Sequence, residues 1–379
     1  MRQTRRKFLV QSALGIGAMP FLAAKIRASA AISSGLAEVF KDDFHLGTAI
    51  SDATLKSDDS ALLNLIAREF NTITAENAMK WEGLQPSANQ FSWNLADDFI
   101  NFGRKNNMLT VGHTLVWHSQ TPDYVFKNKT SFASRETLLR RMQHHIGTVI
   151  DRYKDSVAVW DVVNEAVEQG KWRRSEWLEI IGEEYFSKAF AFARDSDPTA
   201  HLIYNDYNMH NPKKQKFVIS QVNKCKKMGI RVDGVGMECH ATLDEGPPVS
   251  EIETAIVNFA KAGLSVHISE LDVDVLPSAW NYQGAEIDVN YEYSEKINPY
   301  KNALPTNVST RLTERYRELF ELFIKHRDKI ARVSFWGTTD DESWKNDWPV
   351  AGRTNYPLLF DRSRSPKNAY YAIRNLKSK

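Results

Sequence analysis

Cysteine is almost absent from this sequence, since its 379 residues include only Cys225 and Cys239. Two cysteines cannot build the disulfide framework that stabilises small secreted domains. A single bridge would require their Cα atoms to lie within about 7 Å, which the sequence does not show. We therefore expect two buried free thiols and a fold stabilised by its core, because 42% of the residues are hydrophobic and 11% are aromatic.

A net positive charge is absent outside the N-terminus. The 49 lysines and arginines outnumber the 47 acidic residues only because six of them lie in the first thirty positions, which contain no acidic residue. The rest of the chain is mildly acidic and has no basic stripe that could neutralise phosphates, so nucleic acid is not an expected partner. The sequence also contains no HxxxH spacing and no Cys/His cluster, so we expect neither a metal site nor a cofactor.

The N-terminus lacks an apolar run long enough to span a membrane. The segment from Val10 to Ala24 is short and is interrupted by two glycines and a proline. It follows the twin arginines Arg5 and Arg6 and leads to Ala28-Ser29-Ala30, a small-x-small cleavage pattern. Residues 1–30 are therefore interpreted as a twin-arginine-type signal peptide.

Twin-arginine export implies a bacterial protein that folds before it crosses the inner membrane. We expect a periplasmic or secreted monomer with no stable membrane insertion after the signal is removed. The alternative is an uncleaved anchor helix, but no cationic stop-transfer flank follows a full-length apolar run.

Linkers and internal repeats are absent as well. No heptad, short repeat or Pro- or Ser-rich segment interrupts the body of the chain, so a second domain has no visible starting point. We expect one domain from residue 35 to residue 379.

The body of the chain contains a regular alternation of strand-like and helical segments. Eight apolar strand candidates occur, namely Phe44–Ile50, Asn71–Glu76, Leu109–Trp117, Val157–Glu165, His201–Asp206, Gly234–His240, Ser265–Val273 and Arg332–Asp340. Helical patterns lie between them, including Ala61–Phe70, Ser134–Tyr153, Ser175–Arg194, Lys213–Met228, Ser250–Ala262 and Arg311–Arg327. A strand followed by a helix, repeated eight times, predicts a parallel (β/α)8 barrel.

Two short apolar, strand-like runs lead to a glutamate, from Trp160 to Glu165 and from His267 to Glu270. Most carboxylates in an unknown sequence are solvated helix or loop residues. Here both flanks are apolar, so burial without a function would cost several kcal/mol of desolvation. Most glycoside hydrolases use two carboxylates, and a barrel presents such groups at the C-terminal ends of different strands. Glu165 and Glu270 are therefore the predicted catalytic pair.

Six ordered motifs between Phe44 and Tyr371 resemble the xylanases of glycoside hydrolase family 10. The motifs are Thr74 to Lys80 (TAENAMK), Gly112 to Gln120 (GHTLVWHSQ), Trp160 to Ala166 (WDVVNEA), Tyr204 to Tyr207 (YNDY), His267 to Asp272 (HISELD) and Trp336 to Trp344 (WGTTDDESW). The resemblance implies a (β/α)8 barrel and retaining endo-hydrolysis of β-1,4-xylan without a cofactor. It also implies that Glu165 is the acid/base and Glu270 the nucleophile.

The same resemblance assigns further residues to the substrate cleft. The implied substrate-binding residues are Glu76, Asn77, Lys80, His113, Trp117, Gln120, Asn164, Asn205, Tyr207, His240, Trp336 and Trp344. Three further residues are expected to hold these side chains in place without contacting the substrate themselves: His118, Glu238 and Asp272. Some assignments have plain structural alternatives: Trp117 and Trp336 could be core residues, Glu76 and Lys80 a structural ion pair, and Tyr207 a partner of the nucleophile's surroundings.

One segment departs from the family pattern. Where the family usually has Gly-x-Gln-x-His, this chain has Glu238 two residues before His240, and Ala241 follows where an aromatic residue is common. Either Glu238 is protonated and replaces the amide, or it is paired with His240 or Lys80. We expect an activity profile shifted toward acid pH relative to a Glu238→Gln variant.

A long segment from Leu276 to Pro305 contains five aromatic residues, including Trp280, Tyr282 and Tyr291. It is expected either to shape the cleft or to pack on itself as an Ω-loop.

Two other functions are compatible with these residues. A retaining β-1,4-glucanase on the same barrel is the alternative enzyme. Glucose differs from xylose by a 6-hydroxymethyl group, and the candidates for excluding that group are Trp336, Trp344 and the long loop. A non-catalytic xylan-binding protein is suggested only by Glu238 and Ala241.

Overall fold

A computed structural model describes residues 34–57, 59–278 and 292–377 of the chain. The expected export segment, residues 1–30, lies outside the described residues. Gly35–Lys379 forms one compact unit, and the description below concerns that unit by itself.

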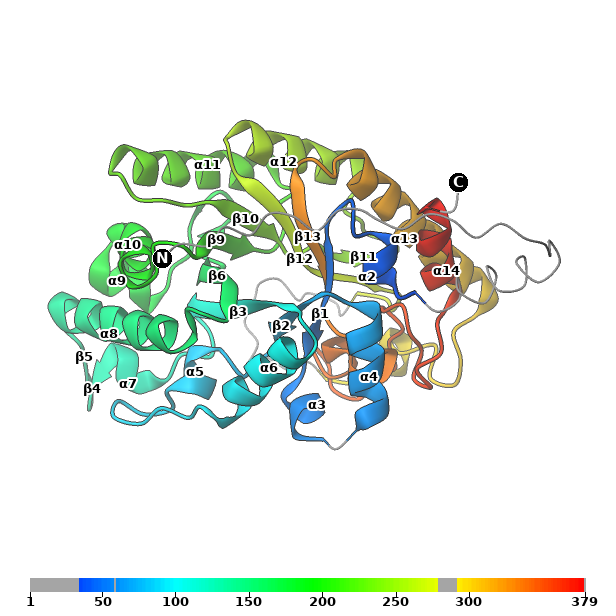
Figure 1. The fold of residues 1–379 in the computed structure, drawn as a ribbon, viewed down its shortest axis with the longest axis horizontal. Coiled ribbons are helices and arrows are strands. Elements are labelled where there is room, and N and C mark those ends of the chain that lie inside the picture. Colours follow the sequence, from blue (N-terminus) through cyan, green and yellow to red (C-terminus); the bar gives the residue numbers. More distant parts are fainter. Residues whose placement is uncertain (1–33, 58, 279–291, 378–379) are drawn as a thin grey trace, which may run out of the picture. The chain divides into compact units, whose positions relative to one another are not determined.

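Eight parallel strands close into a barrel at the centre of this unit (Figure 1). They follow the chain around the barrel and are β1 (His45–Ile50), β2 (Thr72–Ala75), β3 (Leu109–Val116), β6 (Val157–Asn164), β9 (His201–Asp206), β10 (Gly234–Met237), β12 (Ser265–Asp274) and β13 (Ile330–Phe335). Parallel pairing of β13 with β1 closes the ring. The (β/α)8 barrel predicted from the alternation is confirmed.

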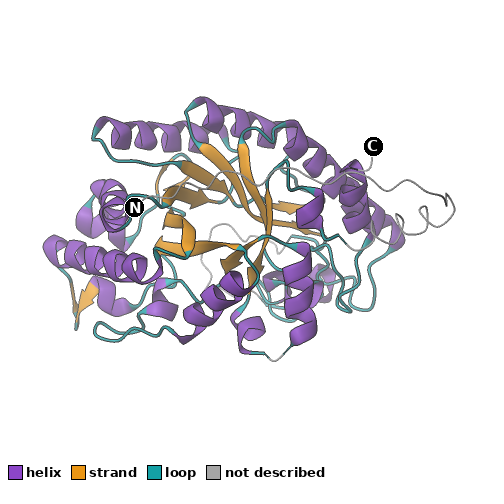
Figure 2. Ribbon diagram, in the orientation of Figure 1, coloured by secondary structure: helices purple, strands orange, loops and turns teal. Residues whose placement is uncertain are grey.

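Helices surround the barrel on its outside, as Figure 2 shows. The longer ones are α4 (Ser60–Glu69), α6 (Asn94–Lys105), α8 (Arg135–Tyr153), α10 (Glu184–Ser196), α11 (Pro212–Lys227), α12 (Val249–Lys261) and α13 (Thr306–Lys325). Shorter ones are α2 (Leu36–Val39), α3 (Asp52–Lys56), α5 (Trp81–Leu84), α7 (Asp123–Phe126), α9 (Glu176–Ile181) and α14 (Asn368–Arg374). Two small hairpins, β4–β5 (Lys127–Asn128 and Ser131–Phe132) and β7–β8 (Val167–Glu168 and Lys171–Trp172), extend the loops.

Three predicted boundaries differ from the structure for reasons of backbone conformation. The helix expected from 175 to 194 is two helices, because Gly182 has φ 91° and ends α9. The last strand ends at Phe335 instead of Asp340, and Gly337 with φ 124° turns the chain soon after it. The sixth strand is interrupted, since β10 ends at Met237 and pairing with β12 resumes in β11 (His240–Thr242).

The barrel interior changes from apolar to polar along the strands. Val111, Val159 and Ile203 form a small buried cluster on β3, β6 and β9. Because strand residues two apart share a face, the next inward positions toward the C-terminal ends are His113, Asp161 and Asn205. All three are buried, and His113 Nδ1 lies 2.8 Å from Asp161 Oδ2. This polar layer lies directly beneath the C-terminal mouth of the barrel.

Close strand packing gives a stability prediction at Gly112. This residue pairs with Trp160 across β3 and β6, and a Cβ at position 112 would lie 2.2 Å from two carbons of the indole ring. We expect Gly112→Ala to lower the free energy of unfolding by about 1 to 3 kcal/mol, because the overpacked ring must shift. Urea-induced unfolding followed by tryptophan fluorescence would measure the change.

Gly147→Ala is the matched control, because Gly147 lies within α8 and a Cβ added there would have Ser196 Oγ, at 3.6 Å, as its nearest neighbour. Alanine there is expected to stabilise the protein by about 0.5 to 1 kcal/mol through helix propensity. Equal effects of the two substitutions would contradict the packing argument.

The two cysteines are not bridged in the structure. Cys225 is buried in α11 and Cys239 is partly exposed next to β10. The expectation of free thiols therefore agrees with the structure, although only one of them is fully buried. Within the described residues, none of the helices has the length and apolar character needed to cross a membrane.

Candidate active site

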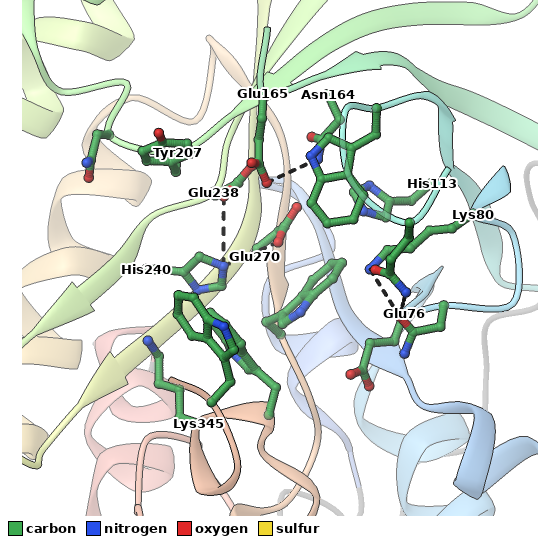
Figure 3. A pocket seen from close by; sticks show the side chains of 17 residues that line it. Glu76, Lys80, His113, Asn164, Glu165, Tyr207, Glu238, His240, Glu270 and Lys345 are labelled. Atoms are coloured by element: carbon green, nitrogen blue, oxygen red, sulfur yellow. Dashed lines mark hydrogen bonds and ion pairs between the residues drawn. The ribbon is translucent and has the colours of Figure 1, made fainter. Parts of the chain in front are cut away.

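A cavity of about 340 Å³ opens at the C-terminal mouth of the barrel (Figure 3). Most of the residues predicted from the sequence line it: Glu76, Asn77, Lys80, His113, Trp117, Gln120, Asn164, Glu165, Tyr207, Glu238, His240, Glu270, Trp336 and Trp344. These residues come from loops that follow seven different strands or from the ends of those strands. Their convergence follows from the barrel, because every parallel strand delivers its C-terminal end to the same face.

Three predicted residues lie behind the cavity wall. Asp272 is buried beneath His240, and the ring of His118 packs against Trp117 with ring centroids 5.7 Å apart. Asn205 is fully buried and is not among the residues that line the cavity, so its predicted contact with the substrate stays a prediction. Strand alternation turns Asn205 into the barrel, where it binds other side chains.

Glu165 follows β6 directly and has a left-handed backbone conformation with φ 53°. Two hydrogen bonds hold this conformation: its N–H donates to the carbonyl of Asn205 at 2.9 Å, and Arg173 Nε donates to its carbonyl at 2.9 Å. Non-glycine residues with positive φ persist only where surrounding contacts impose them. The backbone of Glu165 is thus held in place while its side chain points into the cavity.

The carboxyl group of Glu165 is set up to retain its proton. Burial and the nearby carboxylates of Asp206 and Glu270 together raise the pKa of Glu165 to about 8, against the opposing charge of Arg173. Asn164 Nδ2 donates to Glu165 Oε1 at 3.3 Å. A carboxylic acid that is neutral at neutral pH can donate a proton to a leaving group.

Glu270, on β12, has the opposite character. Burial would raise its pKa, but hydrogen bonds from His240 and Asn205 and the positive charges of His240 and His113 outweigh burial and lower it. Asn205 Nδ2 donates to Glu270 Oε1 at 2.8 Å, and His240 Nε2 donates to Oε2 at 3.3 Å. Glu270 is therefore an ionised carboxylate held between donors.

Two side-chain amides link the carboxyl groups. Asn164 donates to Glu165, and its own Oδ1 accepts from Asn205 Nδ2 at 2.9 Å, while Asn205 also donates to Glu270. Ser269 Oγ donates to Asn205 Oδ1 at 2.6 Å and so sets the direction of the Asn205 amide. Displacing Asn205 would therefore disturb both glutamates together.

A second network holds His240 on the other side of Glu270. Its Nδ1 lies 3.0 Å from Asp272 Oδ1, and Trp344 Nε1 donates to Asp272 Oδ2 at 2.9 Å. Burial lowers the pKa of His240, but Asp272 and the hydrogen bonds to Asp272 and Glu270 raise it to about 9 overall. His240 is consequently a cation beside Glu270 at neutral pH, with its orientation determined by Asp272.

The structure favours one of the two alternatives for Glu238. Its Oε2 lies 3.9 Å from His240 Nε2, which is at the limit of an ion pair. Lys80 Nζ instead donates to Asn77 Oδ1 at 3.1 Å and to Gln120 Oε1 at 2.7 Å. Burial and the charges of Glu270, Glu165 and Asp206 raise the pKa of Glu238 well above its usual value. A neutral acid that replaces the family's amide fits these observations.

The far wall of the cavity is built from β2 and the loop after β3. Burial raises the pKa of Glu76 to about 7 against the opposing charge of Lys80, and burial lowers the pKa of Lys80. The hydrogen bonds of Lys80 to Asn77 and Gln120 show that a simple ion pair with Glu76 is not its main role in the described structure. Lys80 also lies over the Trp117 ring, 4.8 Å from its centroid.

Aromatic rings form the remaining surfaces. Trp336 packs edge-on against His113 with centroids 5.3 Å apart, and Trp344 stacks on Trp348 at 4.8 Å. Trp117 and Trp336 are each only 7% exposed, yet both line the cavity, so each contributes to the core and to the cavity wall. Apolar ring faces next to polar donors are what a sugar-binding cleft requires.

Three lining residues were not predicted from the sequence: Asn208, Lys345 and Trp348. Lys345 and Trp348 follow Trp344 in the same loop, so extending that motif by four residues would have found them. Lys345 Nζ lies 3.6 Å from Asp272 and 4.7 Å from the centroid of the Trp344 ring. Asn208 follows Tyr207, whose hydroxyl accepts from Arg173 at 2.6 Å, away from the nucleophile.

The described part of the long segment packs beside the cavity without lining it. Ile297 contacts Val350, and Asn298 Oδ1 accepts from the N–H of Thr354 at 2.9 Å. Tyr300 accepts a hydrogen bond from the hydroxyl of Tyr356 through its carbonyl at 2.7 Å. Trp280, Tyr282 and Tyr291 lie outside the described residues, so the choice between a cleft role and an Ω-loop stays open for them.

Two of the relatives found by comparison with known proteins share the name endo-1,4-beta-xylanase. Endo-1,4-beta-xylanase A of Xylanibacter ruminicola is 39% identical over 361 residues, covering 95% of this chain and 96% of that protein. The endo-1,4-beta-xylanase of Geobacillus stearothermophilus is 40% identical over 351 residues, covering 90% of this chain and 98% of that protein.

Solved structures show the same relationship. A GH10 endoxylanase retrieved from a sugarcane soil metagenome is 49% identical with a TM-score of 0.86, covering 91% of this chain and 99% of that chain. An intracellular xylanase of Thermoanaerobacterium saccharolyticum, solved as a mutant in complex with xylotriose, is 34% identical with a TM-score of 0.77 and covers 90% and 98% of the two chains. The model of glycosyl hydrolase family 10 matches residues 35–376. This chain, whose eightfold barrel has Glu165 directly after β6 and Glu270 within β12, therefore belongs to glycosyl hydrolase family 10.

Proposed function

We propose that this protein hydrolyses internal β-1,4-xylosidic linkages of xylan with retention of configuration. The observation that carries the proposal is that two buried glutamates line one cavity, where burial raises the pKa of Glu165 and hydrogen bonds from His240 and Asn205 lower that of Glu270. Retaining glycosidases need this combination. Relatives named endo-1,4-beta-xylanase support xylan as the substrate.

In the first step Glu270 attacks the anomeric carbon while Glu165 gives its proton to the departing glycosidic oxygen. The bond between the anomeric carbon and that oxygen breaks, and a glycosyl-enzyme ester forms on Glu270. His240 and Asn205 donate to Glu270 and so keep the attacking group ionised and oriented. Asn164, beside Glu165, is the proposed donor to the sugar 2-hydroxyl, a contact that strengthens in the transition state.

In the second step Glu165, now ionised, accepts a proton from water as the water attacks the same carbon. The ester to Glu270 breaks, and two inversions at one carbon give overall retention. The pKa of Glu165 must fall when Glu270 loses its charge in the ester, because repulsion from Glu270 is one of the causes that raise it. The same electrostatic coupling thus makes Glu165 an acid in one step and a base in the next.

Substrate recognition is divided between polar and aromatic walls. We assign hydroxyl binding on the glycone side to Glu76, Asn77, Lys80, His113 and Gln120, which all line the cavity. Trp117, Trp336 and Trp344 cover ring faces. Xylose lacks the 6-hydroxymethyl group of glucose, and we assign the exclusion of that group to Trp336 and Trp344, which line the cavity.

The test is product analysis on xylan and on carboxymethyl-cellulose with the same enzyme preparation. We expect xylo-oligosaccharides of mixed length from xylan, with the β-anomer formed first as seen by proton NMR. Initial release of the α-anomer would contradict retention. Comparable turnover of carboxymethyl-cellulose would favour the β-1,4-glucanase alternative, and no turnover of either would favour a binding protein.

The pH dependence of kcat/KM follows from the pKa shifts of Glu165 and Glu270. Glu165 works in its protonated form, so its contribution is present below its pKa and is lost as the pH rises through about 8. Glu270 works ionised, and its pKa is lowered from 4.5, so activity is lost only as the pH falls below that value. We expect a broad optimum between these limits, measured on an aryl β-xylobioside in buffers containing EDTA.

The Glu238→Gln variant, assayed under the same conditions, isolates the effect of the extra carboxyl group. In the wild type Glu238 must also keep its proton to replace an amide, whereas glutamine has none to lose. We therefore expect the alkaline limb of the wild type to lie at lower pH than that of the variant. Superimposable profiles would contradict this role of Glu238.

We further propose that the protein is exported in its folded state and acts as a monomer in the periplasm or the medium. Support comes from the twin arginines Arg5 and Arg6 and the small-x-small motif at Ala28 to Ala30. Expression with Arg5 and Arg6 replaced by lysine is expected to retain the enzyme in the cytoplasm, as measured by cell fractionation.

A further inference from the structure

We propose that Glu238, His240 and Glu270 form a binding site for one divalent transition-metal ion of the zinc class, and that the bound ion inhibits the enzyme. One ligand atom of each residue lies within 4.8 Å of those of the other two. Figure 3 shows the three side chains converging on one part of the cavity, on the side of Glu165. Two carboxylates and an imidazole are ligands that Zn²⁺ accepts.

Two of the three distances are close to those of a tetrahedral site. Ligand atoms bound to zinc at 2.0 to 2.2 Å are separated from one another by roughly 3.3 to 3.6 Å in this geometry. His240 Nε2 lies 3.3 Å from Glu270 Oε2 and 3.9 Å from Glu238 Oε2. A small rotation of the Glu238 side chain therefore completes three sides of the site, and the open cavity leaves the fourth position to water.

The support behind His240 points independently to a ligand. A histidine that binds a metal through one ring nitrogen almost always has a carboxylate or carbonyl partner at the other, which fixes the tautomer and the ring direction. Asp272 Oδ1 lies 3.0 Å from His240 Nδ1, so Nε2 is the atom directed at Glu238 and Glu270. Asp272 is fully buried and is itself held by Trp344.

An unpartnered oxygen on the same side of the cavity is a further observation. Glu165 is 7% exposed, and among the described residues its Oε2 has no hydrogen-bond partner. Figure 3 places the Glu165 carboxyl beside that of Glu238. A water on the fourth position of the ion could bind this oxygen, so the site offers both ligands and a partner for the bound water.

Glu238 distinguishes this chain from the usual family pattern. With glutamine at position 238, the site would offer one carboxylate, one imidazole and a weakly binding neutral amide. With glutamate it offers two carboxylates, and their charge balances that of a divalent ion once the carboxyl proton of Glu238 and the Nε2 proton of His240 are released to solvent. The substitution thus creates the metal site at a position where the family has a sugar-binding or supporting amide.

Inhibition rests on the proposed function, because the ion would occupy the nucleophile. Metal coordination takes up Glu270 Oε2, so this carboxylate cannot attack an anomeric carbon, and the ion excludes the sugar from the same space. Xylo-oligosaccharide and Zn²⁺ are therefore expected to compete. Metal binding itself depends only on the three side chains and can be measured without turnover.

The first experiment measures binding to the folded, full-length chain after treatment with EDTA and its removal. Equilibrium dialysis against ZnCl₂, with zinc counted by elemental analysis, is expected to give one tight site per chain in the wild type. We expect the dissociation constant to rise by at least about tenfold in Glu238→Gln. Glu253→Gln is the matched control, since Glu253 forms a carboxylate–histidine pair with His326 on the surface, 2.7 Å apart.

The second experiment measures inhibition of xylo-oligosaccharide hydrolysis by ZnCl₂, each variant being compared with its own metal-free rate. We expect competitive inhibition in the wild type and in Glu253→Gln, with the inhibition constant at least about tenfold higher in Glu238→Gln. Equal zinc binding by the wild type and Glu238→Gln would overturn the site. A wild type without turnover in metal-free buffer would instead count against the proposed function, and dialysis would still decide the metal site.

Discussion

The Glu270→Ala variant is expected to lose xylan hydrolysis by a factor of about 10⁴ or more in kcat, because no other group can form the covalent intermediate. Glu270 is the ionised carboxylate on which hydrogen bonds from His240 and Asn205 converge. Removing it leaves the Glu165 side chain in place, but the pKa of Glu165 falls because repulsion from Glu270 is lost, so wild type and variant are compared at the pH optimum of each. The loss therefore reports on the nucleophile alone.

Azide supplies the decisive measurement for this variant. The small anion fits the space left by the Glu270 side chain and attacks the anomeric carbon of an aryl β-xylobioside from the same face. We expect recovered turnover and an α-xylobiosyl azide, identified by NMR. A β-azide product, or xylan activity within tenfold of the wild type, would show that another residue is the nucleophile.

A surface substitution controls for general damage. Glu179→Ala removes an exposed glutamate of α9 that pairs with Arg174. We expect this variant to retain wild-type activity, since an exposed pair of this kind contributes little. Thermal melting of both variants would separate loss of chemistry from loss of fold.

The Glu165→Ala variant is expected to show a leaving-group-dependent defect. Positioned proton transfer contributes about 10² to 10⁴ in rate, so xylan, whose leaving oxygen needs protonation, should lose that factor. An aryl β-xylobioside with a dinitrophenolate leaving group needs no proton, and its first step should be nearly unaffected. The part of the alkaline limb near pH 8 that reports the titration of Glu165 should also disappear.

Azide distinguishes this variant from Glu270→Ala. Here Glu270 still forms the glycosyl-enzyme, and azide takes the place of the water that Glu165 would have activated. The expected product is a β-xylobiosyl azide, with configuration retained. An equal loss on both classes of substrate, or an α-azide product, would contradict the assignment of Glu165 as acid/base.

The fold could be predicted from the sequence because its signal is local. Eight apolar runs separated by helical patterns determine the order of the elements, and a parallel sheet with short connections closes most simply as a barrel. The predicted ends of helices and strands were wrong where a single residue changed the direction of the backbone, as at Gly182 and Gly337. The interruption of the sixth strand was not predicted. It occurs at Cys239, whose φ is 56°, and a cysteine gives no sequence signal for such a backbone conformation, whereas a glycine would.

The candidate catalytic pair was also found locally, since a carboxylate at the end of an apolar strand is conspicuous at Glu165 and Glu270. Asn205 shows the limit of such reasoning. Its position in a family motif suggested substrate contact, yet its side chain faces the barrel interior and hydrogen-bonds Glu270, 65 positions away. Lys345 and Trp348 were missed because only the loop conformation brings them to the cavity.

The sequence by itself determined the number and order of the barrel strands, the twin-arginine pattern at the N-terminus, the family resemblance and the identity of the two strand-end glutamates. Tertiary structure alone decided the protonation states, because the pKa values of Glu165, Glu238 and Glu270 depend on burial and on charges from other strands. The tertiary structure also brings together the three residues of the candidate metal site, because Glu238 and His240 follow β10 while Glu270 lies on the neighbouring β12. Their spacing along the sequence does not match a metal-binding motif. Spacing along a chain reports neighbours within one element, whereas electrostatics and coordination depend on distances that only the closed barrel creates.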